Sequence, residues 1–231
     1  MKNFLYISES FYSIQGEGQT MGVPAIFLRL TGCNLLCKSK SWICDSIEVW
    51  QKGFKTDFEH VLSSEWVERL EQGAHLIFTG GEPMLHQKSI INFLKWFKEE
   101  HDFKPIIEIE TNGTKEIDED LLSQIDFVNC SPKLSNSGEV YNRRFNETSL
   151  TQISKHPGTI FKFVINKKKD IEEILIDFNC INMNKVVLMP AGEDVKKLKK
   201  VRLMVIDQCL KMGWRYSDRL QVVIWNKATG V

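Results

Sequence analysis

Three cysteines lie close together near the N-terminus and constrain this chain more than any other feature. Cys33, Cys37 and Cys44 follow an apolar, strand-like run, Pro24–Leu30, in a chain with only six cysteines. A closed structural zinc site requires four ligands, and an odd number of thiols does not form a disulfide framework. Three thiolates do suit a [4Fe–4S] cluster whose fourth iron stays open for a ligand. The spacing therefore predicts a metal centre at which a small molecule binds and reacts.

The composition excludes several classes of protein. The 231 residues fit a single domain, 1–231, and an apolar fraction of 42% is enough for a hydrophobic core. Because 30 Lys and Arg balance 30 Asp and Glu, no basic field is available for nucleic acid. No apolar run approaches the roughly 20 residues of a membrane span, and no secretory leader is visible. We therefore expect a cytoplasmic protein with no nucleic-acid or membrane partner, in which clustered cysteines indicate metal or catalysis.

Strand-like runs alternate with segments of helical period, which indicates parallel strands joined by helical crossovers. We expect an α/β fold, either an open doubly wound sheet or an incomplete barrel, with ligands at the carboxyl ends of the strands. The polar segment 132–147 is expected to be a functional loop or lid. The expected strands are 25–30, 75–78, 106–109, 127–130, 160–165, 185–189 and 220–225, and the expected helices are 64–72, 87–101, 118–124, 169–178 and 193–212.

Unusual short motifs follow or end several of the expected strands. They are Thr79-Gly80-Gly81-Glu82-Pro83, Glu110-Thr111-Asn112-Gly113, Ser131-Pro132-Lys133 and Met189-Pro190. Each of the first three motifs alone is also an ordinary turn. In a parallel architecture, however, they share one rim with the cysteine loop, and glycine lets backbone approach a ligand closely. The combination predicts one site at this rim.

The segment Ile14-Gln15-Gly16-Glu17 precedes the first expected strand. It lacks the Lys-Ser/Thr ending of a P-loop. Gln15 offers a donor and an acceptor, and Glu17 a carboxylate, groups that suit a guanine-like edge.

Two further polar residues each have two interpretations. Arg29 is either an exposed edge residue or a fork for a substrate carboxylate. Ser46, which follows Cys44-Asp45, is either a turn cap or a ligand of Mg²⁺.

Together these residues resemble the 7-carboxy-7-deazaguanine synthases, a family of radical S-adenosylmethionine (SAM) enzymes. The match begins with the highly specific stretch 11–18, continues through 24–30, Gly32-Cys33-Asn34-Leu35 and Cys44-Asp45, and extends through the rim motifs over nearly the whole chain. The resemblance implies an incomplete (β/α) barrel of the radical SAM type with parallel strands, the cluster loop at the C-terminal rim, and a homodimer.

The resemblance also implies a reaction. With SAM on the open iron, one electron from an outside donor such as a flavodoxin would release a 5′-deoxyadenosyl radical. That radical would take a hydrogen atom from 6-carboxy-5,6,7,8-tetrahydropterin. Ring contraction and loss of ammonia would then give 7-carboxy-7-deazaguanine, which feeds queuosine and related deazapurines.

The resemblance assigns roles to particular residues. The cluster ligands would be Cys33, Cys37 and Cys44, and the Mg²⁺ ligand would be Ser46. The pterin would contact Ile14, Gln15, Gly16, Glu17, Arg29, Thr79 and Val231. SAM would contact Ile43, Cys44, Asp45, Gly81, Glu82, Asn112, Ser131, Pro132, Lys133, Met189 and Pro190.

The chain departs from the family pattern in the cysteine loop. Radical SAM loops commonly read Cys-x3-Cys-x2-Cys, whereas six residues separate Cys37 from Cys44 here. Loop-closure entropy makes the added length cost only about 1 kcal/mol. Position 46 is Ser where many relatives have Thr, so the hydroxyl is kept.

Two alternatives stay open from the sequence. One is another radical SAM activity, such as a glycyl-radical activating enzyme, which would not need Gln15, Glu17 and Arg29. The other is a non-catalytic zinc-binding module with His60 or His75 as fourth ligand, although neither has a ligand-like spacing to the cysteines.

Overall fold

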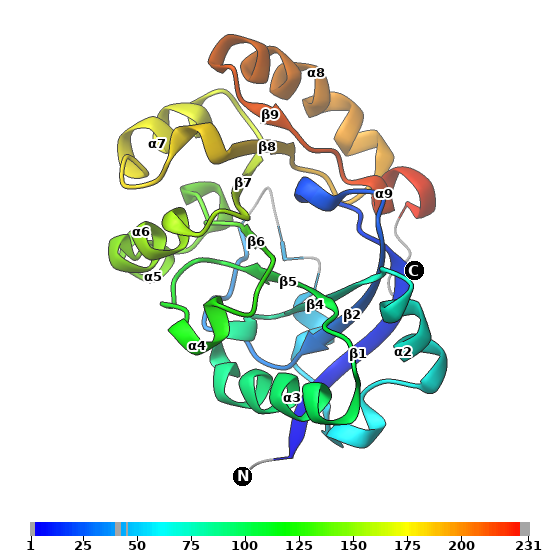
Figure 1. The fold of residues 1–231 in the computed structure, drawn as a ribbon. Coiled ribbons are helices and arrows are strands. Elements are labelled where there is room, and N and C mark those ends of the chain that lie inside the picture. The colour runs from blue at the N-terminus through cyan, green and yellow to red at the C-terminus, as the bar shows by residue number, and fades with distance from the viewer. Residues whose placement is uncertain (1–2, 40–42, 45, 227–231) are drawn as a thin grey trace.

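The computed structural model describes residues 3–39, 43–44 and 46–226. Within these residues, nine strands form a single sheet in the order β3-β1-β2-β4-β5-β6-β7-β8-β9. Strands β2 and β4 to β9 run parallel, while β1 is antiparallel to both β2 and β3. The sheet curls without closing (Figure 1), so the expected incomplete barrel is confirmed. The strands are β1 (Phe4–Ile14), β2 (Pro24–Leu30), β3 (Phe54–Asp57), β4 (His75–Gly80), β5 (Ile106–Thr111), β6 (Phe127–Cys130), β7 (Thr159–Ile165), β8 (Val186–Pro190) and β9 (Arg215–Tyr216).

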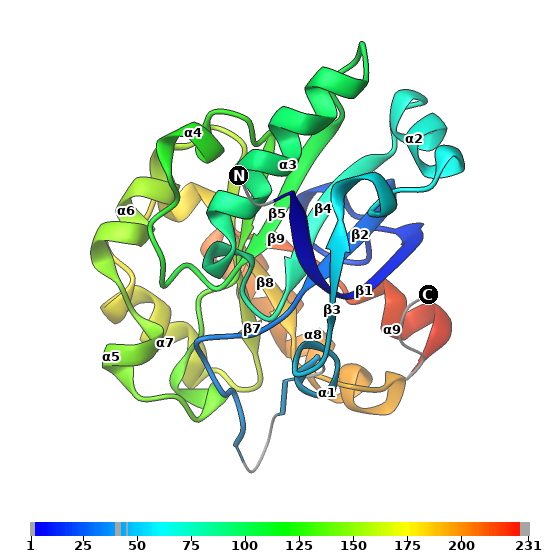
Figure 2. The same ribbon diagram turned by 90° about the horizontal axis from the view of Figure 1, so that it is seen from below.

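The longer helices cover the outer side of the curled sheet, as Figures 1 and 2 show. Asp118 and Asp194 start α4 and α8 as N-caps, as expected, because each carboxylate accepts a hydrogen bond from a backbone N–H of the first turn. The helices are α1 (Ile47–Trp50), α2 (Ser64–Glu71), α3 (Gln87–Glu100), α4 (Glu119–Leu122), α5 (Tyr141–Arg144), α6 (Glu147–Lys155), α7 (Lys169–Asp177), α8 (Val195–Met212) and α9 (Leu220–Trp225), with short 3-10 turns η1 (Gly18–Thr20), η2 (Phe58–His60), η3 (Pro83–Leu85), η4 (Ser135–Ser137) and η5 (Met183–Lys185). No helix in these described stretches is long and apolar enough to cross a bilayer.

The two faces of the sheet differ in chemistry because side chains alternate along each strand. Apolar residues point outward and pack against the helices, where burial of each large side chain contributes about 1.5–3 kcal/mol. Fully buried members of this core are Leu28, Phe78, Ile109, Val128, Phe161 and Phe163. Their neighbours point inward and line a cavity; among them are Arg29, Thr79, Glu110, Asn129 and Lys162. The inner face is therefore the part of the fold that carries polar chemistry.

Two expectations about local structure are wrong. Leu220–Trp225 is the helix α9, not a strand, and its first N–H donates to the carbonyl of Gly16, 2.8 Å away. A short apolar run does not distinguish a strand from a buried helical turn, and here contact with the N-terminal segment decides. The segment 132–147, expected to be a loop, contains the short helices η4 and α5.

Candidate active site

A cavity of about 690 Å³ opens at the carboxyl ends of the parallel strands. The cysteine loop, the N-terminal segment and all four rim motifs contribute to its wall, so the expected convergence of these segments is observed. The sequence-predicted residues that line it are Ile14, Gln15, Gly16, Glu17, Arg29, Cys33, Cys37, Cys44, Ser46, Thr79, Gly81, Asn112, Ser131, Lys133 and Met189.

The lengthened cysteine loop folds back on itself. Lys38 and Ile43 form an antiparallel bridge, and the N–H of Cys44 donates to the carbonyl of Cys37 at 3.0 Å. The two ends of the lengthened loop are therefore held close together. This hairpin brings Cys37 and Cys44 together although they are far apart for a radical SAM loop. Asp45 lies outside the described residues.

Each of the three thiols is free and faces the same cavity. Burial raises the pKa of Cys33, and it raises the pKa of Cys37 to about 11. Both thiols therefore carry protons at neutral pH until a metal replaces them. Over the described residues, no three His, Cys, Asp or Glu side chains are gathered closely enough to hold a single metal ion. Three thiols are the donor set of a [4Fe–4S] cluster that keeps one iron open, and they are one ligand short of a closed zinc site.

The Gly-Gly-Glu-Pro motif packs directly against the cysteine loop. A Cβ at Gly81 would lie 2.0 Å from the carbonyl oxygen of Gly32, so this approach requires glycine. Glu82 is fully buried and does not line the cavity. Its carboxylate accepts from Thr111 Oγ1 at 2.8 Å and from Asn112 N at 2.7 Å. Burial raises the pKa of Glu82, against the hydrogen bonds that favour its charged form.

The remaining rim residues divide into those that reach the cavity and those that support it. Lys133 reaches it, and its Nζ donates to Ser131 Oγ at 3.1 Å. Pro132 and Pro190 are buried beside the lining residues, and Ile43 is 49% exposed outside it. Val231 lies outside the described residues.

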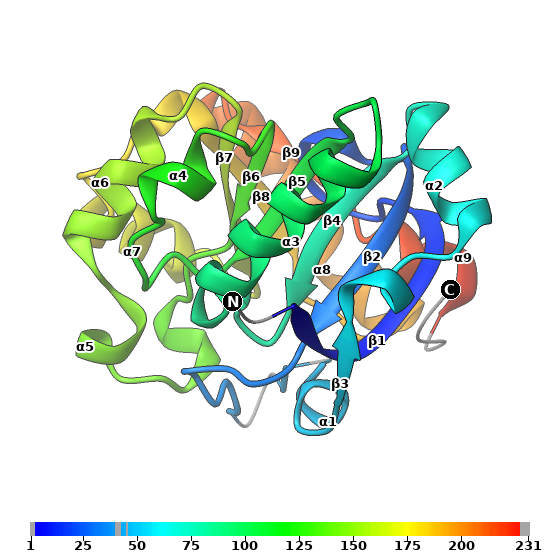
Figure 3. The same cartoon turned by 60° about the horizontal axis from the view of Figure 1, so that its bottom comes forward.

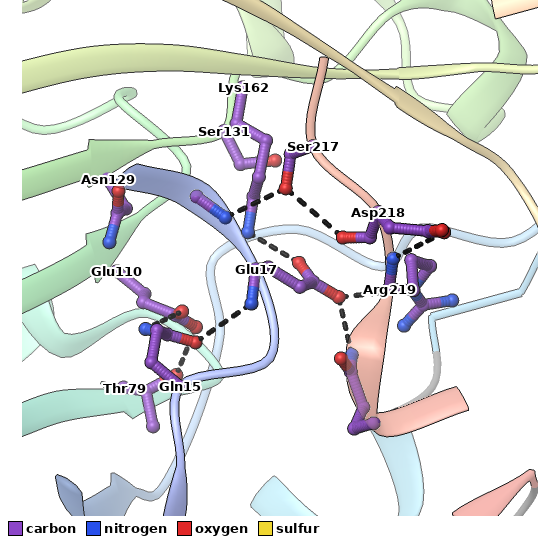
Figure 4. Close-up of polar contacts among 12 residues, drawn as sticks. Gln15, Glu17, Thr79, Glu110, Asn129, Ser131, Lys162, Ser217, Asp218 and Arg219 are labelled. Atoms are coloured by element: carbon purple, nitrogen blue, oxygen red, sulfur yellow. Dashed lines mark hydrogen bonds and ion pairs between the residues drawn. The ribbon is translucent and has the colours of Figure 1, made fainter. Parts of the chain in front are cut away.

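Glu17 sits between two buried cations at the floor of the cavity (Figure 4). Its carboxylate accepts from Lys162 Nζ at 2.5 Å, from Arg219 Nε at 3.0 Å and from Gln221 Nε2 at 2.6 Å. Burial alone would raise the pKa of Glu17, but the charges of Lys162 and Arg219 outweigh it and hold this pKa far below its usual range. Conversely, burial would lower the pKa of Lys162, and Glu17 more than reverses this. The ion pair is therefore fully charged at neutral pH.

A second network holds Gln15 beside this floor. The Gln15 amide donates to Glu108 Oε1 at 2.7 Å and to Glu110 Oε1 at 3.1 Å. The other oxygen of Glu110 accepts from Thr79 Oγ1 at 3.0 Å. Glu108 also accepts from Thr20 at 2.7 Å and is hydrogen-bonded to His75. His75, one of the two possible zinc ligands, is thus hydrogen-bonded to the carboxylate of Glu108.

Arg29 is not at a sheet edge, because β2 lies between β1 and β4. Its Nε donates to Glu9 at 3.0 Å, and its guanidinium lies 5.9 Å from the centre of the Phe11 ring. Phe11 stacks on Phe27 with ring centres 4.9 Å apart, and both rings line the cavity. The arginine therefore projects into the cavity beside an aromatic wall.

Comparisons with known proteins agree with this geometry. A family model described as a 4Fe-4S single cluster domain matches residues 14–154. The 7-carboxy-7-deazaguanine synthase of Halobacterium salinarum is 32% identical over 97% of this chain and 91% of its own length. The chain belongs to the 7-carboxy-7-deazaguanine synthase family. The synthase of Pyrobaculum aerophilum is 29% identical over 97% of this chain and 96% of its own.

The crystal structure of QueE from Escherichia coli superposes on this fold with a TM-score of 0.69 at 24% identity, covering 94% of each chain. Family, fold class and the expectation of an enzyme are therefore confirmed. Membership of the family also implies an iron–sulfur cluster and SAM, which the three cysteines fit. The glycyl-radical and zinc-module alternatives find no support among these relatives.

Several polar residues of this synthase-family site were missed from the sequence. Lys162 interrupts an otherwise apolar strand, which is a signal that could have been used, because a charged residue in a buried strand needs a partner. Glu108 gives the same signal. Arg219 and Gln221 gave no such signal, because their place at the cavity depends on α9 docking against Gly16.

Proposed function

We propose that this chain converts 6-carboxy-5,6,7,8-tetrahydropterin to 7-carboxy-7-deazaguanine with loss of ammonia. One observation carries the proposal: three free thiols and a set of charged side chains line the same cavity. The chain would work as one domain, 1–231, in deazapurine biosynthesis.

At the cysteine end, Cys33, Cys37 and Cys44 would hold the [4Fe–4S] cluster. When bound, cluster and SAM supply the one-electron chemistry that produces a carbon radical. Asn112, Ser131 and the ammonium of Lys133 offer polar partners to SAM along the same wall. Because Gly81 has no side chain, its backbone packs directly against the carbonyl of Gly32 in this wall.

At the opposite end, the protein orients the pterin. Glu17 is held ionised, and its Oε2, which among the described residues accepts only from Lys162, can still accept one hydrogen bond from an exocyclic amine or a ring N–H. Gln15 and Thr79 position the carboxylate of Glu110 beside it. The Nε of Arg29 donates to Glu9. The other N–H groups of the guanidinium can donate to the substrate carboxylate.

Further parts of the proposal concern partners. Ser46 Oγ lies 3.7 Å from the Cys44 sulfur and lines the cavity, so it would place a Mg²⁺ between cluster and substrate. We also propose a flavodoxin-like electron donor, a homodimer and a cytoplasmic location, where the thiols stay reduced.

The test is anaerobic iron–sulfur reconstitution, followed by incubation with SAM, dithionite and the carboxypterin, with products identified by mass spectrometry. The pterin and the product differ in composition by one ammonia only, so the hydrogen atom taken from the pterin must be returned to it. We expect 7-carboxy-7-deazaguanine and ammonia, with methionine and 5′-deoxyadenosine from the part of the SAM that is cleaved without this return. Formation of 5′-deoxyadenosine without the deazaguanine, in the presence of substrate, would contradict the assigned substrate. A colourless protein that holds zinc and never cleaves SAM would contradict the whole proposal.

A further inference from the structure

The segment that leads into α5 is built against the cysteine loop. Figures 2 and 3 show this segment beside the loop that follows β2. In this segment the carboxylate of Glu139 accepts a hydrogen bond from the backbone N–H of Leu36. Leu36 lies in the turn between Cys33 and Cys37, directly before the second cysteine.

Lys38, on the other side of Cys37, is contacted from the same segment. Gly138 has φ of 84°, a left-handed conformation, and a Cβ there would lie 2.3 Å from the carbonyl oxygen of Lys38. The two backbones therefore meet at a distance that only glycine allows. Gly138 and Glu139 thus contact the residues on both sides of Cys37.

Arg143 adds a third contact from the first turn after this segment. Its Nη2 donates to the carbonyl of Asn34 at 2.8 Å, and its Nη1 lies 3.5 Å from Glu139 Oε2. The side chain of Asn34 is held in turn by Thr114 and Asn112, at 2.7 and 3.0 Å. The turn between the first two cysteines is therefore braced from two directions.

A surface ion pair alone does not account for Glu139. Its side chain is 5% exposed, whereas that of Arg143 is 55% exposed. An exposed partner contributes little, and a buried carboxylate must recover its lost hydration through hydrogen bonds. The N–H of Leu36 supplies one such bond, so the burial of Glu139 and the path of the loop are linked.

We propose that Glu139 is a positioning residue for Cys37, whose carboxylate fixes the backbone between the first two cluster ligands. The proposal rests on the proposed iron–sulfur function. Because Glu139 is a buried negative charge next to a cluster ligand, it would also lower the cluster's reduction potential, which responds to nearby charge. A residue with a purely structural role elsewhere in the fold would not shift this potential.

Three variants separate the hydrogen bond from the charge. Glu139→Ala removes both, and Glu139→Gln removes the charge while its amide oxygen can still accept from Leu36. Glu68→Gln, an exposed glutamate on α2, is the matched control. Thermal unfolding first establishes that each variant is folded.

The first measurement is hydrogen exchange of the 33–38 amides in cluster-free protein, which does not depend on activity. We expect about 10- to 100-fold faster exchange at Leu36 in Glu139→Ala, because a hydrogen bond to a charged group is lost. The second is chelator-driven iron loss from reconstituted protein, expected to be faster in Glu139→Ala and largely restored in Glu139→Gln. The third is the reduction potential by electron paramagnetic resonance, expected to rise in both Glu139 variants and stay unchanged in Glu68→Gln.

Wild-type exchange and iron-loss rates in Glu139→Ala, or failure of Gln to restore them, would overturn the positioning role. An unchanged potential in Glu139→Gln would overturn the electrostatic part. If wild-type protein itself accepts no cluster, the proposed function fails. The exchange experiment still tests whether Glu139 fixes the backbone at Leu36.

Discussion

The two ends of the cavity are completed in different ways. At the proposed substrate end, Glu17, Lys162 and Arg219 form ion pairs within the protein itself. At the cysteine end, burial raises the pKa of Cys33 and Cys37, so both thiols are protonated unless a metal binds them. A site that the protein completes contributes to folding stability, whereas one completed by a cofactor contributes mainly after the cofactor binds. Mutations at the two ends should therefore separate activity from stability.

The largest effect is expected at the cysteine end. Cys37→Ala removes one of the three proposed cluster ligands, so iron binding and SAM cleavage should be lost completely. The free energy of unfolding of cluster-free protein should change by only about 1 kcal/mol, the cost of one small buried side chain. Iron content, deoxyadenosine production and chemical denaturation measure the three quantities. Retained SAM cleavage would contradict this prediction. So would a loss in free energy of unfolding as large as the one expected below for Glu17→Gln, because the two ends of the cavity would then not differ.

The next effect is expected in stability at the substrate end. Glu17→Gln leaves Lys162 and Arg219 buried without their carboxylate. We expect a loss of about 3 kcal/mol in free energy of unfolding, at the low end for a broken buried pair because Glu17 keeps 14% side-chain exposure. Glu65→Gln, which breaks the exposed pair with Arg69, is the control and should cost no more than about 0.5 kcal/mol.

The pH dependence of the same variant gives the sign of the effect. Glu17 has a folded-state pKa far below its unfolded value, so its contribution is fully present above about pH 4.3 and is lost as pH falls further. The stability difference between wild type and Glu17→Gln should therefore be constant from about pH 5 to 8 and shrink in acid. A difference that grows as pH falls would show that the ion pair is not the cause.

The sequence predicted the cysteine end better than the substrate end, and the reason is physical. Thiol spacing is a local property, so Cys33, Cys37 and Cys44 can be recognised along the chain. The rim motifs were predictable because the carboxyl ends of parallel strands meet at one edge.

The floor of the cavity depends on contacts between distant segments. Glu17 meets Arg219 across 202 positions and Lys162 across 145 positions. The docking of α9 decides the first contact, and the run Leu220–Trp225 does not itself distinguish helix from strand. Strand β1 was also missed, because its polar and aromatic residues do not form an apolar run.

A third test concerns ligand selectivity within the cavity. Arg29→Ala should weaken binding of the carboxypterin by about 10- to 100-fold, the value of a hydrogen-bonded charge, and change SAM affinity little. Arg29→Lys keeps the charge but not the planar fork, so it should recover only part of the affinity. Calorimetric titration of each ligand makes the comparison. Equal losses for both ligands would assign Arg29 to the shape of the cavity and not to the substrate carboxylate.

The smallest effect tests whether the substrate end acts as one network. Thr79→Val removes the hydroxyl that donates to Glu110, and should cost about 1 kcal/mol in free energy of unfolding, while Thr79→Ser keeps the donor and should cost less. Combined with Glu110→Gln, which changes the acceptor of the same bond, the two losses should not add. Combined with Cys37→Ala, at the other end, they should add within about 0.5 kcal/mol, because no partner is shared. Coupling of Thr79 to Cys37 as strong as its coupling to Glu110 would mean that the cavity is one cooperative unit, and the division into a preformed end and a cofactor-completed end would fail.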